Sequence, residues 1–231
     1  MGIAERSIRH KDALRHQILD AARVILTTEG FAKFSMRSIG KRIEYSPPTI
    51  YLYFKNQAEL VLTLCEEVYG ELADVLEAAA ATPGSPLARL RAALRAYIDF
   101  GFADPTRYRL AFMTSLAPHV DASTPLEEGA QARRAAETLR QRVRAVLRAP
   151  TPQAEETTLQ ALWAVIHGVV AVVIEHPGFP FVPQERLIAR TLALVLNGFG
   201  APGRANGAAS REAQPAGRAA GRQPRRTVSA C

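Results

Sequence analysis

The stretch SMRSIGKRIEYSPPTIYLYFKNQAEL, residues 35–60, decides the fold of this chain of 231 residues. Ser35 belongs to the residue types that cap helix N-termini, because its side-chain oxygen can accept a backbone N–H of the first turn. Ile39 and Ile43 follow one helical turn apart. These features predict a short helix that begins after Ser35 and buries its isoleucine face.

A second short helix is expected directly afterwards. Glu44 and Tyr45 form the turn between the two helices, and Ser46 stands where the next N-cap is needed. Pro47 suits the first turn of the second helix, because proline has no N–H that would go unpaired there. Two short helices joined by about four residues form a helix-turn-helix unit, which we predict over residues 35–54.

The outward side chains of the second helix are suited to nucleic acid. They are Thr49, Tyr51, Leu52 and Tyr53, with Lys55 just after them. Tyrosine and threonine can touch both base edges and phosphates, and a helix N-terminus attracts phosphate through its free N–H groups. The alternative is an ordinary helical hairpin with exposed aromatic side chains. The pattern favours DNA binding over that hairpin.

The rest of the chain also reads as helices, because apolar residues recur at helical spacing and no segment alternates with period two. A capping residue followed by proline predicts helix starts at Ser46, Ser85, Asp104, Thr124 and Thr151. Later candidate helices lie at 86–103, 105–114, 125–148, 152–175 and 184–197. Gly198 is expected to end the last of them. The predicted fold is all-α, with an N-terminal three-helix helix-turn-helix domain followed by a C-terminal helical domain.

The formal net charge is +7, and its location matters more than its sum. Residues 201–231 contain six arginines against one glutamate, and residues 31–55 contain five basic side chains against one acidic. The basic N-terminal segment suits a polyanion such as DNA, although solvated surface charge gives the same composition. The arginines between 133 and 148 are read as a solvated helix face. The segment 201–231 is rich in Gly, Ala, Pro and Arg and is expected to be disordered.

Several classes of protein and site are disfavoured. Cys65 and Cys231 do not suggest a disulfide framework, so a reducing cytoplasm is expected. The apolar run 169–174 is far shorter than the roughly 18 residues of a membrane span, and the polar N-terminus lacks a signal-peptide core. We find no catalytic constellation, no phosphate-binding glycine loop and no metal-ligand spacing. The expectation is therefore a protein that is not an enzyme and has no metal or cofactor.

Residues 12–72 resemble the DNA-binding domain of the TetR family of transcriptional regulators. The matching features are ILDAA at 18–22, EGF at 29–31, Ser35, Ile39, the run from Ser46 to Tyr51, and YFKNQAEL at 53–60. About sixty residues match in order and spacing. Tyr45 stands where Val is usual and Pro48 where Gly or Ala is usual, and these departures are expected to change the operator preference.

The resemblance implies a set of DNA-contacting residues. The set is Ser35, Arg37, Ser46, Pro48, Thr49, Tyr51, Tyr53 and Lys55. Ser35 and Arg37 would lie against the DNA backbone, and Lys55 would hold a phosphate. The residues at 48, 49, 51 and 53 would face the groove.

The resemblance also implies a C-terminal ligand-binding and dimerisation domain, here over residues 80–200. Trp163, His167 and Gly168 resemble the Trp-x3-His-Gly signature of one subgroup, the Trp-His-Gly (WHG) subgroup. Trp163 and His167 share a helix face. They either line a ligand pocket or form plain core with Gly168 admitting a close helix contact, and the second interpretation is favoured. Candidate pocket residues are Tyr97, Phe112, Trp163 and His167, and further candidates are Phe100, Phe102, Tyr108 and Met113.

The leading hypothesis is a homodimeric repressor that a small-molecule ligand releases from a palindromic double-stranded DNA operator. The helices at 152–175 and 184–197 would pack against the second subunit. Two alternatives stay open. One is a non-regulatory nucleic-acid binder driven by the basic segment 201–231, and the other is a helical small-molecule-binding protein or enzyme.

Overall fold

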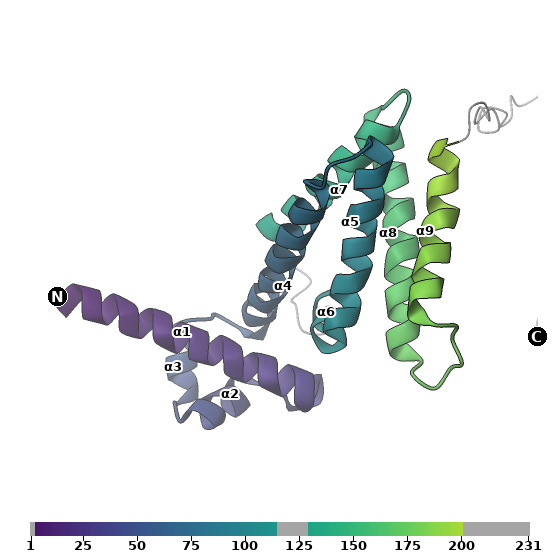
Figure 1. Cartoon of the computed structure of the whole chain (residues 1–231). Helices are drawn as coiled ribbons and strands as arrows, with labels where there is room; N and C mark the ends of the chain where they lie inside the picture. Colours follow the sequence, from purple (N-terminus) through teal and green to yellow (C-terminus); the bar gives the residue numbers. More distant parts are fainter. Residues whose placement is uncertain (1–2, 115–128, 201–231) are drawn as a thin grey trace, which may run out of the picture. The chain divides into compact units, whose positions relative to one another are not determined.

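The chain folds into α-helices in a computed structural model that describes residues 3–114 and 129–200 (Figure 1). Within those residues there is one 3-10 turn and no β-strand. The elements are α1 (Ile3–Thr28), η1 (Phe31–Lys33), α2 (Met36–Ile43), α3 (Pro47–Tyr51), α4 (Gln57–Ala80), α5 (Pro86–Ala103), α6 (Pro105–Phe112), α7 (Ala130–Val146), α8 (Pro152–Glu175) and α9 (Gln184–Gly200). The predicted all-α fold is confirmed.

Four of the five predicted pairs of a capping residue and a proline stand at helix starts, namely those of α3, α5, α6 and α8. The side chains of Ser85, Asp104 and Thr151 each accept a first-turn N–H within 3.2 Å. The fifth pair, at Thr124, lies outside the described residues. Gly198 does not end α9, which continues to Gly200, because Gly198 does not adopt the left-handed conformation of a helix-ending glycine.

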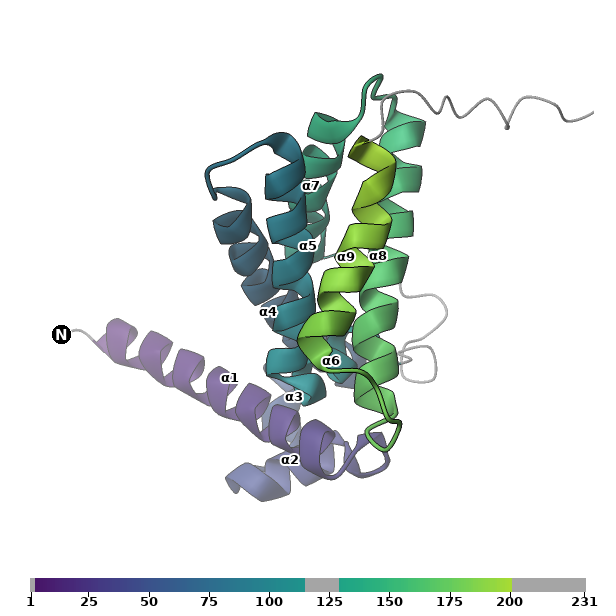
Figure 2. The ribbon, with the colours of Figure 1, turned by 45° about the vertical axis from the view of Figure 1, so that its right-hand side comes forward.

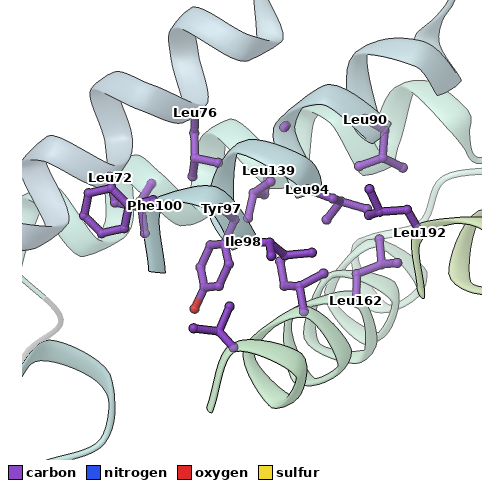
Figure 3. Close-up of a cluster of buried hydrophobic side chains, with 14 of the residues drawn as sticks. Leu72, Leu76, Leu90, Leu94, Tyr97, Ile98, Phe100, Leu139, Leu162 and Leu192 are labelled. Carbon is purple, nitrogen blue, oxygen red and sulfur yellow. The ribbon is translucent and has the colours of Figure 1, made fainter. Parts of the chain in front are cut away.

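Two hydrophobic clusters form the core, and α4 takes part in both. The first cluster buries the apolar faces of α1, α2 and α3 against the beginning of α4, which contributes residues up to Cys65. The second cluster begins at Val68 of α4 and adds α5, α7, α8 and α9. Figure 3 shows the ring of Tyr97 in this second cluster, among leucines from α4, α5, α7, α8 and α9. Figure 2 shows α8 and α9 lying alongside each other, and α5 packs against both.

Ion pairs tie α7 to its neighbours. They are Arg134–Glu77, Arg140–Glu156 and Arg144–Glu155, with N–O distances of 2.5, 2.9 and 2.8 Å. The Glu155 side chain is only 5% exposed, and its hydrogen bonds to Arg144 lower its pKa. The interpretation of this arginine series as a solvated face is incomplete for these three members, since they are paired, although Arg134 and Arg144 remain 39% and 57% exposed. They meet carboxylates of α4 and α8, which sequence spacing alone does not bring near.

One face of α8 and α9 is apolar and exposed. By length and composition α8 is the one described helix that could cross a membrane, yet less than a third of that stretch is buried in the chain. The search for an uninterrupted apolar run missed α8 because polar residues interrupt it. Val165 and Val172 of α8 are 40% and 49% exposed, and Leu194 of α9 is 57% exposed. An exposed apolar face of this kind is typical of an interaction surface.

Candidate functional site

The turn between α2 and α3 is closed by three local features. Ser35 caps α2 in a reciprocal box, since its Oγ accepts the Ser38 N–H at 3.0 Å while the Ser38 Oγ accepts the Ser35 N–H at 2.9 Å. Glu44 lies in the left-handed region with φ 61°. A Cβ at Gly40 would lie 2.5 Å from the carbonyl oxygen of Tyr45, so the turn requires glycine there. Sequence analysis missed Gly40, although a glycine inside a predicted helix was the available signal.

The short helix α3 is buried on one side and exposed to solvent on the other. Ile50 is fully buried, whereas Tyr51 is 53% and Leu52 is 83% exposed. Among the eight predicted DNA-contacting residues, the exposed ones are Arg37, Ser46, Pro48, Tyr51 and Lys55, and the partly buried ones are Ser35, Thr49 and Tyr53. Tyr53 packs against the first cluster, as Tyr45 does. Their rings therefore contribute to the core of the unit.

The N-terminus of α3 differs from the expected cap. Ser46 accepts no N–H of α3 with its side chain; instead its hydroxyl lies 2.9 Å from the hydroxyl of Thr49. Pro47 and Pro48 occupy the first two helical positions, and the Thr49 N–H of the third position donates to the Ser46 carbonyl oxygen at 3.0 Å instead. Ser46 and Thr49 thus form a small hydroxyl pair on the exposed side of the helix.

The backbone around Lys55 is fixed from both directions. Asn56 caps α4 by accepting the Glu59 N–H at 2.8 Å, and the Glu59 carboxylate accepts the Lys55 N–H at 2.6 Å. The guanidinium of Arg15 on α1 lies 5.1 Å from the centre of the adjacent Phe54 ring. Lys55 therefore projects from a rigid junction rather than from a loose loop.

Basic side chains around the helix-turn-helix lack acidic partners. Arg37, Lys41 and Lys55 are exposed and form no ion pair with any residue that the structure describes. Arg42 is the exception, because it pairs with Glu29 at 3.1 Å. In α7, by contrast, the arginines named above are held by carboxylates. The unpaired cations favour an anionic partner at the surface formed by α2 and α3.

A cavity of about 550 Å³ lies in the second cluster, between α4, α5, α7 and α8. Its aromatic lining consists of Tyr69, Tyr97, Phe112 and Trp163. Leucines and alanines from α4, α7 and α8 supply most of the remaining wall, and Gln160 and the Arg140–Glu156 pair are its polar members. Three of the four predicted pocket residues therefore line one cavity. The fourth, His167, does not line it.

His167 is connected to the cavity by a chain of three hydrogen bonds. The Trp163 Nε1–H donates to the Tyr97 Oη at 3.0 Å, and the hydroxyls of Tyr97 and Tyr108 lie 3.0 Å apart. The Tyr108 Oη lies 2.6 Å from the Nδ1 of His167. Neither of the two sequence interpretations is complete, because Trp163 lines a cavity while His167 is a hydrogen-bonded residue behind it.

Burial determines the protonation states of the side chains in this series of hydrogen bonds. Desolvation raises the pKa of Tyr97 to about 12 and also raises the pKa of Tyr108. Desolvation lowers the pKa of His167. At neutral pH both phenols therefore keep their protons, and the imidazole is neutral.

The close helix contact expected at Gly168 is made instead at Gly101 of α5. Nothing lies within 4 Å of the place that a Cβ of Gly168 would take. A Cβ at Gly101 would lie 2.5 Å from the Val170 Cγ1 of α8 and 3.1 Å from the Tyr108 ring. Gly101 is thus the residue that lets α8 and the Tyr108 ring approach α5.

Two models of one protein family match the chain. The model described as "Bacterial regulatory proteins, tetR family" matches residues 18–64, which include the helix-turn-helix. The model described as "Tetracyclin repressor-like, C-terminal domain" matches residues 90–195, which include the hydrogen-bonded chain and part of the cavity lining. The order of the two matches agrees with the order of the two clusters.

Two curated proteins are similar over part of their length. The HTH-type transcriptional activator FasR of Mycolicibacterium smegmatis is 32% identical over 102 residues, which cover 44% of this chain and 47% of FasR. The fatty acid metabolism regulator protein of Bacillus subtilis is 33% identical over 61 residues, which cover 26% of this chain and 31% of that protein. The chain thus matches less than half the length of either relative.

Solved structures share the fold over most of the described chain. SCO4313, a protein assigned a regulatory role, is 25% identical, with a TM-score of 0.66 over 82% of this chain and 98% of its own. A TetR family regulator from Marinobacter aquaeolei is 17% identical, with a TM-score of 0.59 over 82% of this chain and 96% of its own. The TetR family regulator PfmR from Thermus thermophilus is 17% identical, with a TM-score of 0.58 over 78% of this chain and 97% of its own.

Proposed function

Because this chain belongs to the TetR family of DNA-binding transcriptional regulators, which are not enzymes, we propose that it is a repressor released from its operator by a small-molecule ligand. The observation that carries the proposal is the coexistence, in one chain, of a helix-turn-helix with unpaired cations and a separate cavity of about 550 Å³. The first feature suits DNA and the second suits a small molecule. The helix-turn-helix domain is placed at 12–72 and the ligand and dimer domain at 80–200.

The eight predicted DNA-contacting residues have different roles in the proposed complex, and their exposure decides which role each can take. Tyr51 and Pro48 are exposed and reach the major groove, and Thr49 lies beside them. Arg37 and Lys55 are exposed cations that contact phosphates. Tyr53 is packed against the first cluster, so only the free edge of its ring remains for DNA. Ser35 and Ser46 position the starts of α2 and α3 against the backbone.

The exposed apolar face of α8 and α9 supports a homodimer. Burying it against a second copy would remove Val165, Val172 and Leu194 from water. The dimer places two copies of α3 in successive major grooves, about 34–36 Å apart, on a palindromic operator. Such a regulator acts inside the cell, and we place it in the cytoplasm.

The ligand acts by differential affinity. A molecule in the cavity releases DNA only if it binds more tightly to the conformation that fits the operator poorly. The cavity is lined by α4, which also contributes residues to the first cluster beside Ile50 of α3, so one helix takes part in both sites. The likeness of Trp163, His167 and Gly168 to the Trp-His-Gly subgroup is part of this proposal. FasR is an activator, so the direction of regulation needs its own measurement.

The test is a gel-shift titration at low salt on the DNA upstream of the chain's own gene, with random DNA of equal length beside it. Tyr51→Ala is expected to weaken binding to the upstream DNA more than binding to random DNA. Lys55→Ala is expected to weaken both and to lower the salt slope by about one. Arg148→Ala removes an exposed arginine far along the chain from α3 and serves as the control.

The outcomes are decisive. Failure of the wild-type chain to shift the upstream DNA overturns the proposal, and so does equal loss on both DNAs for both variants. Transcription in vitro from the same fragment then separates repression from activation. Deleting residues 201–231 leaves upstream recognition intact if α3 reads the sequence, and abolishes it if the chain is a binder driven by that basic segment.

A further inference from the structure

The hydrogen-bonded chain from Trp163 to His167 can run in two directions. A phenol donates one hydrogen bond and accepts two, and a neutral imidazole has one nitrogen that donates and one that accepts. The Trp163 Nε1–H can only donate, so the Tyr97 Oη always accepts at that end. The direction of the other two bonds therefore depends on whether the His167 Nδ1 carries a proton.

When the Nδ1 of His167 is unprotonated it accepts, and every bond points away from the cavity. Tyr108 then donates to His167, Tyr97 donates to Tyr108, and Trp163 donates to Tyr97. All three donors are used within the chain. A molecule in the cavity finds no free hydroxyl hydrogen at Tyr97.

When the Nδ1 of His167 is protonated it donates to Tyr108. Tyr108 is 0% exposed, so its own hydroxyl hydrogen needs an acceptor inside the core; Tyr97 is that acceptor, and two bonds reverse. Tyr108 accepts from His167 and donates to Tyr97, whose oxygen now accepts from both Tyr108 and Trp163. The hydroxyl hydrogen of Tyr97 is left without a partner in this chain of bonds. Tyr97 lines the cavity and is 2% exposed, so that hydrogen faces a site where bulk water is scarce.

We propose that the cavity binds an apolar molecule with one uncharged hydrogen-bond acceptor, and that protonation of His167 strengthens this binding by turning the Tyr97 hydroxyl toward it. The inference rests on the proposed ligand-responsive function. An acceptor such as a ketone, ester or lactone carbonyl satisfies Tyr97, while leucines and aromatic rings enclose the rest of the molecule. His167 acts through Tyr108 and Tyr97 and is a positioning residue, since it does not line the cavity.

The charge at the cavity edge argues against an acidic ligand. Arg140 is the one cation among the described lining residues, and it is held by Glu137 at 2.8 Å and by Glu156 at 2.9 Å. Glu137 does not line the cavity, so the lining carries one guanidinium and one carboxylate, Arg140 and Glu156, which are already paired with each other. A carboxylate ligand would have to displace one of these partners, whereas a neutral carbonyl would not.

The described side chains that pack on His167 are uncharged aromatic groups. The protonation of His167 itself therefore sets the direction of the hydrogen bonds. Its ring contacts Tyr108 and Phe112 of α6 and Trp163 of its own helix, and Tyr97 of α5 follows beyond Tyr108. Tyr69 of α4 packs on Phe112 and donates to the Ala111 carbonyl. Within residues 3–114 and 129–200 no carboxylate or basic side chain is bonded to the imidazole. The phenols stay protonated, so a pH change reaches the chain through His167.

The test uses 2-nonanone and 2-methyl-1-nonene, which have the same shape but carry a carbonyl and a methylene group respectively. Trp163 is the only tryptophan of the sequence and lines the cavity, so its emission reports occupancy during titration of the full-length protein without DNA. The ketone is expected to bind roughly three- to tenfold more tightly at about pH 5 than at about pH 8, as expected for one gained hydrogen bond. The alkene is expected to bind equally at both.

Three variants locate the effect. Tyr108→Phe breaks the hydrogen-bond connection between His167 and Tyr97. The ketone still binds to this variant, but its affinity no longer depends on pH. Tyr97→Phe removes the preference for ketone over alkene at both pH values. His176→Gln changes an exposed histidine at the end of α8 and leaves the pH dependence as in wild type. Circular dichroism at both pH values confirms that each variant is folded.

Equal affinity for the two compounds, or binding of neither, overturns the inference. Ketone binding that keeps its pH dependence in Tyr108→Phe overturns the role of His167. These titrations contain no DNA, so their outcome is independent of the gel shift. A chain that shifts its operator but shows no preference for the ketone retains the proposed function and loses this inference.

Discussion

Gly40 shows how one missing side chain allows the helix-turn-helix to close. The place of its Cβ is taken by the carbonyl oxygen of Tyr45, 2.5 Å away, so α2 and the turn meet backbone to backbone. Backbone atoms cannot move aside as the end of a flexible side chain can. Gly198, in contrast, has nothing within 4 Å of its Cβ position.

Gly40→Ala is expected to lower the free energy of unfolding by about 1–3 kcal/mol, because the added methyl group overpacks the turn. It should also weaken operator binding, since α3 is displaced relative to α2. Urea denaturation and the gel shift measure the two effects. Gly198→Ala is the control and is expected to be neutral or stabilising by up to about 1 kcal/mol. A Gly40→Ala variant as stable as wild type would contradict the geometry of the turn.

At the scale of elements, α4 supplies the cap of another helix. The Glu66 carboxylate accepts the Gln131 N–H at 3.0 Å, in the first turn of α7. A Cβ at Gly129, the N-cap of α7, would overlap the Glu66 carboxylate. The carboxylate thus occupies the position that an N-cap side chain normally takes, next to the positive end of the helix dipole.

Glu66→Ala is expected to cost about 1 kcal/mol of unfolding free energy, because it removes both the acceptor and the charge at the start of α7. Glu66→Gln keeps an acceptor oxygen and should recover part of the loss. Urea denaturation of the three proteins gives the comparison. An alanine variant with wild-type stability would show that the interhelical cap contributes nothing.

The ion pairs of α7 predict the response to acid. Hydrogen bonds to arginine lower the pKa values of Glu137, Glu155 and Glu156 below their ordinary 4.5. A carboxyl whose folded pKa is depressed contributes stability that is fully present above its unfolded pKa and is lost as the pH falls through the folded value. The melting temperature should therefore decline as the pH falls below about 4.5, and it should decline less steeply in Glu155→Gln. Identical slopes would exclude the Arg144–Glu155 pair as a contributor.

The helix starts were predictable because their causes are local. A capping side chain and a proline act within one turn, and α5, α6 and α8 begin where those residues stand. The caps at Ser46 and Gly129 were not predictable in the same way. The Ser46 hydroxyl pairs with the Thr49 hydroxyl rather than with an N–H of α3, and the cap of α7 comes from a residue far earlier in the chain.

The two candidate sites were predictable to different degrees, because the residues of one are close together in the sequence and those of the other are not. The surface of α2 and α3 is built from residues close together in sequence, so the resemblance could propose its members residue by residue. The chain from Tyr97 through Tyr108 to His167 joins three helices, and no sequence spacing sets which hydroxyl meets which nitrogen. Aromatic residues at helical spacing suggested a pocket, but only packing separates those that line the cavity from those behind it.

At the scale of the whole molecule, the exposed apolar face of α8 and α9 is the interface of the proposed homodimer. Leu194 is 57% exposed on α9, and Val172 is 49% exposed on α8. Each fully buried aliphatic side chain contributes about 1.5–3 kcal/mol, so a few such residues suffice to favour a dimer at low concentration. DNA binding depends on this face only through the dimer, because α3 belongs to the other cluster.

Leu194→Glu should therefore convert the dimer to a monomer and weaken operator binding without changing the fold. A buried carboxylate would lose its hydration at the interface, whereas in the monomer it stays in water. Light scattering after gel filtration should give a mass near the 25.2 kDa of one chain. The gel-shift midpoint should rise about tenfold or more, because one copy of α3 holds only half of a palindrome.

Val75→Glu is the matched control, since it places the same charge on a 38% exposed valine of α4, away from the face of α8 and α9. This variant is expected to remain a dimer and to bind the operator as the wild type does. If Leu194→Glu stayed dimeric, the interface would lie elsewhere. If it became monomeric and yet bound DNA with unchanged affinity, one copy of α3 would suffice for recognition, and the two-fold arrangement proposed here would be wrong.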